Sequence, residues 1–182
     1  MEMIQIQNKN FIKKRLLLTA IFAVIFIASF YAGTEIQVSK SDVKPIVQEL
    51  TKSISSVKAV NNKLGIFMHN TSIGLPMFVP GFGIVWGIFA SVTTGVAFNA
   101  VISITPKLAV HSPLELLLAS PFGFMELVAY SIGMSRSYLL IVGIIKRQIR
   151  NQLKSLLIEV WIVIGLLVVA GLIEYVMIGG TL

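Results

Sequence analysis

The sequence predicts an all-α, polytopic transmembrane bundle of about five spans, with an external amphipathic helix. Three observations lead to this fold class. The chain of 182 residues is 55% hydrophobic and only 13% charged, with a mean hydropathy of +0.86. Water-soluble domains contain fewer hydrophobic and more charged residues than this. Its apolar residues collect in stretches of about 20, the length that crosses a bilayer as a helix. Its basic residues gather at the ends of these stretches, as in membrane proteins.

One membrane domain is expected over residues 1–182, with spans at about 16–33, 64–79, 82–104, 121–145 and 156–178. The first apolar run follows a basic segment, but bulky Phe30 stands where a signal-peptide cleavage site would need a small residue. We therefore expect a retained anchor.

The second and third spans are expected on either side of a tight turn at Pro80 and Gly81. The second is short and contains Gly74 and Pro76, so we expect it to be kinked or incomplete. A further short apolar helix is expected at 113–118 and suggests a re-entrant element ahead of the fourth span.

An external amphipathic helix is expected over residues 41–60. Its apolar residues recur at spacings of three and four and so line one helical face: Val43, Ile46, Val47, Leu50, Ile54 and Val57. This face would rest on the protein's own spans or on the bilayer surface, and docking of a partner helix remains the alternative.

The net charge of +7 comes largely from two basic clusters beside the first and last spans. The clusters are Lys9, Lys13, Lys14 and Arg15, and Lys146, Arg147, Arg150 and Lys154. Neither has the interleaved aromatic residues of a nucleic-acid-binding face, so no nucleic-acid partner is expected. With five spans both clusters lie on the same side of the membrane. The positive-inside rule then predicts a cytoplasmic amino terminus and an extracytoplasmic carboxyl terminus in the cell membrane.

Two carboxylates, Glu126 and Glu174, fall inside predicted spans, where a charge costs about 2.5–3.5 kcal/mol at the centre. Each should therefore face protein or water. Glu126 and Arg136 are ten residues apart, about 280° on a helix, so they do not share a face and a partner must come from another span.

The candidate intramembrane polar network is Glu126, Glu174, Arg136, His69, Asn70 and Asn99. One interpretation is a hydrogen-bonded network that fixes helix packing. The other is an ion or proton pathway through Glu126, with Glu174, Arg136 and His69 as relay members.

Small residues mark candidate sites of close helix packing. Gly83 and Gly87 form a GxxxG pattern, and Gly133 with Ser137 repeats the spacing. We expect packing sites there, with no inference about oligomeric state.

No catalytic pattern is present. The chain has no cysteine and only two histidines, His69 and His111, and it lacks GxSxG, HExxH, Walker and dinucleotide-binding motifs. The spacing of His111 and Glu115 is more typical of a helix start than of a metal site. We therefore expect no enzyme, no cofactor and no metal site.

Three segments resemble the stage II sporulation protein M (SpoIIM-like) family of integral membrane proteins. They are NNKLGIFMHN (Asn61 to Asn70) leading into TTGVAFNAV, SPFGFMELVAYSIGMSRSYLL (Ser120 to Leu140), and GLIEYVMIGG near the end. The Pro-x-Gly-x-x-Glu element is the most specific part, although Phe122 stands where the family usually has His. The resemblance implies that Glu126 and Glu174 are regular features of this fold, with either a structural or a functional role.

The resemblance also implies a non-enzymatic role, since the namesake works with separate peptidoglycan-degrading proteins during engulfment in spore formers. We expect a scaffold or accessory subunit that associates with the lipid bilayer and with other membrane subunits or itself. Two alternatives stay open. One is a small transporter or channel component with Glu126 in the pathway, and the other is an accessory subunit of a membrane-bound redox enzyme.

Overall fold

The computed structural model of the chain describes residues 2–36, 63–105 and 110–179, and in these residues the fold is all-helical. The elements are α1 (Glu2–Thr34), α3 (Lys63–Gly74), the 3-10 helix η1 (Leu75–Phe78), α4 (Phe82–Ile104), α5 (Pro113–Ala119), α6 (Pro121–Ile145) and α7 (Ile149–Gly179). The predicted fold class is thus confirmed. The amphipathic helix expected at 41–60 lies outside the described residues.

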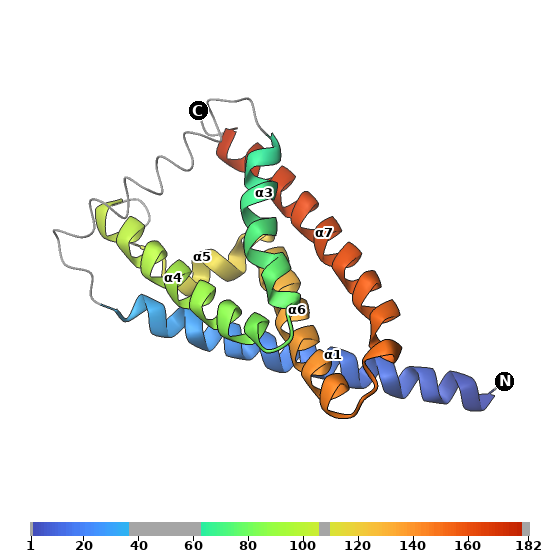
Figure 1. Cartoon of the computed structure of the whole chain (residues 1–182). Coiled ribbons are helices and arrows are strands. Elements are labelled where there is room, and N and C mark those ends of the chain that lie inside the picture. Colours follow the sequence, from blue (N-terminus) through green and yellow to red (C-terminus); the bar gives the residue numbers. More distant parts are fainter. Residues whose placement is uncertain (1, 37–62, 106–109, 180–182) are drawn as a thin grey trace.

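The helices form two crossed pairs around a central helix (Figure 1). α1 and α4 lie side by side, and α3 lies beside α7. The latter pair is antiparallel, because Phe67 approaches Gly171 while Gly74, further along α3, approaches Leu167. α6 packs against both pairs, and α5 leads into it. α6 is therefore the element whose side chains can reach most of the others.

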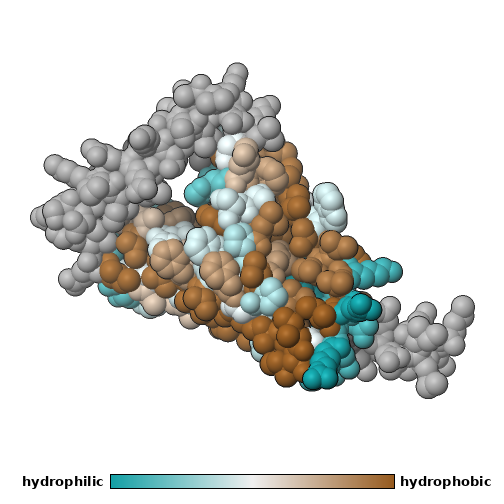
Figure 2. Space-filling view, in the orientation of Figure 1, coloured by the Kyte–Doolittle hydropathy of each residue, from teal (hydrophilic) through white to brown (hydrophobic). Residues whose placement is uncertain are grey.

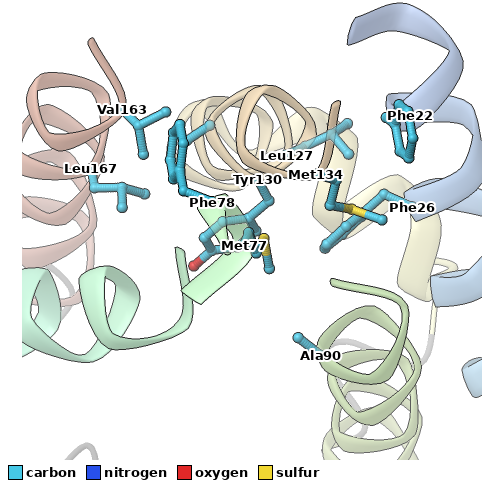
Figure 3. Packing of buried hydrophobic residues seen from close by; sticks show 11 residues of the cluster. Phe22, Phe26, Met77, Phe78, Ala90, Leu127, Tyr130, Met134, Val163 and Leu167 are labelled. Carbon is cyan, nitrogen blue, oxygen red and sulfur yellow. The ribbon is translucent and has the colours of Figure 1, made fainter. Parts of the chain in front are cut away.

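The apolar core surrounds α6 (Figure 3). Met134 of α6 and Met77 of η1 are fully buried, as are Val163 and Leu167 of α7. Phe26 of α1 reaches this core, where its ring lies 5.8 Å from that of Tyr130. Long, flexible methionines and aromatic rings fill the irregular space where helices cross at steep angles.

Four helical segments are long and apolar enough to cross a membrane within the described chain: Ile12–Thr34, Phe82–Ser103, Pro121–Ile145 and Ile149–Met177. Many large apolar side chains on them are exposed, including Val24, Val85 and Trp161. An exposed apolar surface of this kind suits contact with lipid acyl chains. The last of these helices starts at Ile149, several residues earlier than expected, so it includes the basic residues Arg150 and Lys154.

The segment expected as the second span, 64–79, is the one that differs from the prediction of five spans. It consists of the 12-residue α3 and the four-residue η1, which together fall short of the 20 or so residues of a full crossing. Pro76 explains the break, because proline has no backbone N–H and its ring clashes with the preceding helical turn. Gly81 then turns the chain into α4 with φ of 77°, a left-handed conformation that favours glycine.

Two serines define the start of the short helix and of the central helix. The backbone N–H of Glu115 donates to the Ser112 hydroxyl at 3.1 Å, and that of Gly123 donates to the Ser120 hydroxyl at 3.2 Å. Each serine precedes a proline at the first helical position, which is a favoured helix start. The short helix expected at 113–118 is therefore present, and Ser120 fixes where Glu126 enters the bundle.

Glycines allow close backbone approaches, and two of these glycines join α1 to α4. A side chain at Gly33 would collide with the carbonyl of Val92, and one at Gly95 would collide with the carbonyl of Phe30. Backbone atoms cannot move aside as a flexible side chain can. Close approach at small residues is a main source of helix association in membranes, where lipid removes the usual hydrophobic driving force.

We predict that Gly95→Ala destabilises the protein by roughly 1–3 kcal/mol, because the new methyl group overlaps backbone atoms of α1. Gly165→Ala is the matched control, since nothing lies within 4 Å of a side chain added there. The control should leave stability unchanged or raise it by up to about 1 kcal/mol through helix propensity. Thermal unfolding in detergent measures both, and equal effects would contradict the close α1–α4 contact.

Candidate functional site

The first polar cluster joins α3, α6 and α7 around Glu126. The side-chain amide of Asn70 donates to a Glu126 carboxyl oxygen at 2.5 Å. The Tyr130 hydroxyl donates to the backbone carbonyl of Asn70 at 3.5 Å, a long contact. Glu174 on α7 lies within electrostatic reach of Glu126. Asn70 is buried, whereas Glu126 and Glu174 are half-buried, so the two carboxyl groups keep part of their surface exposed.

This cluster combines two carboxyl groups with a neutral amide donor. The amide satisfies one lone pair of Glu126 and ties α3 to the start of α6. Carboxyl oxygens that keep free lone pairs can accept a proton or a small cation. The arrangement is therefore compatible with a structural contact and with an ion-binding position.

The second polar cluster joins α1, α6 and α7 around Glu159. Arg15 donates to both carboxyl oxygens of Glu159, with both N–O distances at 2.6 Å. Arg136 also donates to both oxygens, from Nε at 2.7 Å and from Nη2. One carboxylate thus receives two bidentate guanidinium groups, which we call the Arg-Glu-Arg cluster (Arg15, Arg136 and Glu159).

Neutral groups take up further donors of the two arginines. Arg136 donates to the side-chain carbonyl of Gln152 at 2.9 Å. Arg15 donates to the hydroxyls of Ser135 at 2.7 Å and Thr19 at 3.1 Å, and to the backbone carbonyl of Ile132 at 3.2 Å. All five N–H groups of Arg15 consequently have an acceptor.

The Arg-Glu-Arg cluster is largely buried, so it has a large effect on the free energy of unfolding. The side chains of Arg136, Arg15 and Glu159 are 2%, 13% and 14% exposed. A buried ion pair must repay the cost of leaving water, which requires good geometry and saturated hydrogen bonding. Both guanidinium groups meet Glu159 in bidentate geometry, and every side-chain nitrogen of Arg136 has an acceptor. The cluster is a demanding constraint on the relative positions of α1, α6 and α7, because loss of Glu159 leaves two buried guanidinium groups without a counter-charge.

An apolar layer lies between the two clusters. Arg136 is ten residues after Glu126 on α6, about 15 Å along the helix axis. Tyr130 and Met134 on α6, together with Val163 and Leu167 on α7, are buried in the intervening stretch (Figure 3). The described residues therefore contain two separate polar clusters at different depths.

The six candidate network residues are distributed unevenly. Asn70, Glu126 and Glu174 come together, as the first cluster. Arg136 lies in the second cluster, paired with Glu159 rather than with Glu126 or Glu174. His69 is exposed on α3, and Asn99 of α4 donates to the carbonyl of Ile36 at 3.4 Å, beyond the end of α1.

The predicted packing residues all lie at contacts around η1 and α6. A side chain at Gly83 would collide with the Met77 carbonyl, one at Gly87 would lie 2.5 Å from Cγ of Met134, and one at Gly133 would lie 2.8 Å from Cβ of Met77. Ser137 donates to the carbonyl of Val79 at 2.6 Å. Gly133 and Ser137 thus place η1 and Val79 against α6, while Gly83 and Gly87 let α4 approach η1 and α6.

The surface pair of His111 and Glu115 is 3.1 Å apart and exposed. Among the residues that the structure describes, no three His, Cys, Asp or Glu side chains gather as a potential metal site.

Sequence reasoning missed Glu159 and assigned Arg15 only to the basic flank of the first span. The available signal was a carboxylate in the apolar sequence LLIEVW at the start of the last span. Its partners come from two other helices, α6 across a turn and α1 from the far end of the sequence, so neither periodicity nor spacing could identify them.

We predict that Glu159→Gln destabilises the protein by roughly 3–5 kcal/mol, because it leaves two buried guanidinium groups without a counter-charge. Arg15→Gln should cost less, since Arg136 and Glu159 remain a balanced pair. The control is Glu115→Gln, an exposed carboxylate on α5, which should change stability by no more than about 0.5 kcal/mol. Thermal unfolding in one detergent compares the three variants. If Glu159→Gln lowered the stability no more than the control does, the cluster would not stabilise the packing of these helices.

The fold and these two clusters define a class: a helical, multi-pass membrane protein whose polar groups are concentrated between its helices. The family model described as Stage II sporulation protein M matches residues 16–177, and the chain therefore belongs to the SpoIIM family. The family resemblance expected from the sequence is confirmed. Neither a curated protein nor a solved structure matches the chain. The matched region contains both polar clusters apart from Arg15, which immediately precedes it.

Proposed function

We propose that this chain is a non-enzymatic scaffold or accessory subunit of a larger membrane complex. The observation that carries the proposal is the Arg-Glu-Arg cluster. Arg136 is the one charged residue of the described chain that is fully buried, and its pairing with Glu159, which Arg15 shares, joins α1, α6 and α7. A pathway or a reaction site would need such a charge to be available to a ligand. Because these charged side chains are used to hold helices together, we favour a protein that acts by keeping a fixed shape for other subunits to bind.

A scaffold also needs surfaces that other subunits can cover. Apolar side chains are exposed along α1, α4 and α7, for example Val24, Val85 and Trp161. Without water to drive association, such faces bind other helices through shape and small residues. The partners we propose are other membrane subunits or further copies of this chain, within one membrane domain over residues 1–182.

The proposed topology places the amino terminus in the cytoplasm and the carboxyl terminus outside. The α6–α7 turn carries Lys146 and Arg147, and hydrogen bonds between Arg15 and Glu159 hold the basic start of α1 near the start of α7. Both basic clusters consequently lie at one end of the bundle, as the positive-inside rule favours. α3 and η1 then return the chain through the bundle between the first span and α4.

We expect that purification from the native membrane in mild detergent, followed by native mass spectrometry, yields this chain with defined partners or copies at fixed stoichiometry. A partner that belongs to a transport or redox complex would define the process. A stable monomer without partners, recovered under conditions that preserve other membrane complexes, would contradict the scaffold proposal.

A second candidate is a small transporter or channel component with Glu126 in the pathway. The specific observation in its favour is the partly open cluster of Glu126, Glu174 and Asn70. Few groups of this kind occur inside membrane spans without a role in structure or transport.

Glu126→Gln distinguishes the two roles of this cluster. A glutamine carbonyl can still accept the hydrogen bond from Asn70, so we expect thermal stability to change by less than about 1 kcal/mol. In proteoliposomes, the transport role predicts loss of cation or proton flux in this variant and normal flux in Glu115→Gln. Absence of flux in the wild-type protein, or flux that Glu126→Gln leaves unchanged, would remove the transport candidate.

A further inference from the structure

We propose that the end of the bundle beside the α6–α7 turn binds the headgroups of anionic phospholipids. The proposal rests on six exposed cationic side chains that we call the basic collar: Lys13, Lys14, Lys146, Arg147, Arg150 and Lys154. It goes beyond the proposed function and does not depend on it, because a scaffold, a transporter and a redox subunit would all present this end to one leaflet.

The Arg-Glu-Arg cluster is what brings the collar together. Arg15 follows Lys13 and Lys14 directly on α1, and its hydrogen bonds to Glu159 hold this part of α1 against α7. Lys154 lies five residues before Glu159, about 7.5 Å along α7. Cations from the start of α1 and from the α6–α7 hairpin are therefore held at one end of the bundle. Figure 2 shows hydrophilic residues gathered around this end and apolar residues beyond it.

The charge of the collar is not neutralised within the described part of the chain. Glu159 is the one carboxylate among the described side chains at this end, and both of its oxygens are engaged by Arg15 and Arg136. Of the other carboxylates, Glu115 pairs with His111 and Glu126 binds Asn70. The collar therefore presents a concentrated positive potential to an anion from outside the chain.

Apolar side chains next to the collar favour a phospholipid over a soluble anion. Leu16 and Leu17 follow Lys14 and are each 64% exposed, Ile145 precedes Lys146 and is 75% exposed, and Leu157 on α7 is 62% exposed. A phospholipid satisfies both features at once, with its phosphate beside the cations and its acyl chains on the apolar side chains. An acidic protein segment would cover the cations and leave the apolar residues without a partner.

The test uses the full-length protein in a neutral detergent, with bound lipids counted by native mass spectrometry during titration with phosphatidylglycerol or phosphatidylcholine. We expect phosphatidylglycerol to bind about tenfold or more tightly than phosphatidylcholine. Changing Lys146, Arg147, Arg150 and Lys154 together to Gln should abolish this preference. The matched control exchanges Lys for Arg and Arg for Lys at the same four positions, which keeps the charge and should keep the preference.

Inorganic phosphate at the same concentration separates the lipid from a free anion, and it should displace little phosphatidylglycerol because it lacks acyl chains. Equal binding of the two lipids to the wild-type protein would overturn the proposal. So would a preference that survives in the glutamine variant, or full displacement by phosphate. If the glutamine variant does not fold, the wild-type comparison and the phosphate competition still decide.

Discussion

The need to compensate a buried guanidinium group constrains the whole bundle. Arg136 is fully enclosed on the central helix, and a guanidinium group in a membrane interior needs a counter-charge and hydrogen-bond acceptors. Glu159 and Gln152 provide these from α7, and Arg15 then shares the same carboxylate from α1. α1 is thereby fixed at one level with α6 and α7, although it is distant from them in sequence, and the remaining packing follows from that arrangement.

The apolar core separates the Arg-Glu-Arg cluster from the first polar cluster, around Glu126. Beyond Arg136, the buried side chains of Met134, Val163 and Leu167 fill the centre, and Glu126 and Asn70 meet on its far side. Charged groups at one end hold the helices together and orient the basic collar, while the carboxyl groups at the other level remain partly open. A rigid scaffold depends on the charged groups that hold the helices together. A transport role would depend on the partly exposed carboxyl groups.

Much of the fold could be predicted from the sequence, because span length, basic flanks and proline positions are local signals. They located α4, α6 and the short helix before α6, and the angular separation of Glu126 and Arg136 correctly excluded a pair between them. The second expected span is interrupted, as its glycine and proline predicted: α3 ends at Gly74, and Pro76 lies in the 3-10 helix that follows. Pairing across helices could not be predicted: Glu159 meets Arg15 only after three helices have packed. Equally, nothing in the spacing of Gly33 and Gly95 marks them as the close contacts between α1 and α4.

A double-mutant cycle between Arg136 and Glu159 tests the central claim most directly. Free energies of unfolding would be measured for the wild-type protein, Arg136→Gln, Glu159→Gln and the double variant in the same detergent. We predict a coupling energy of at least about 2 kcal/mol, because Glu159→Gln leaves Arg136 buried without a counter-charge and Arg136→Gln removes that charge, whereas Glu159 still pairs with Arg15 when Arg136 alone is changed. A coupling energy below about 0.5 kcal/mol would mean that the two residues act independently, and would contradict the view that their pairing organises the bundle.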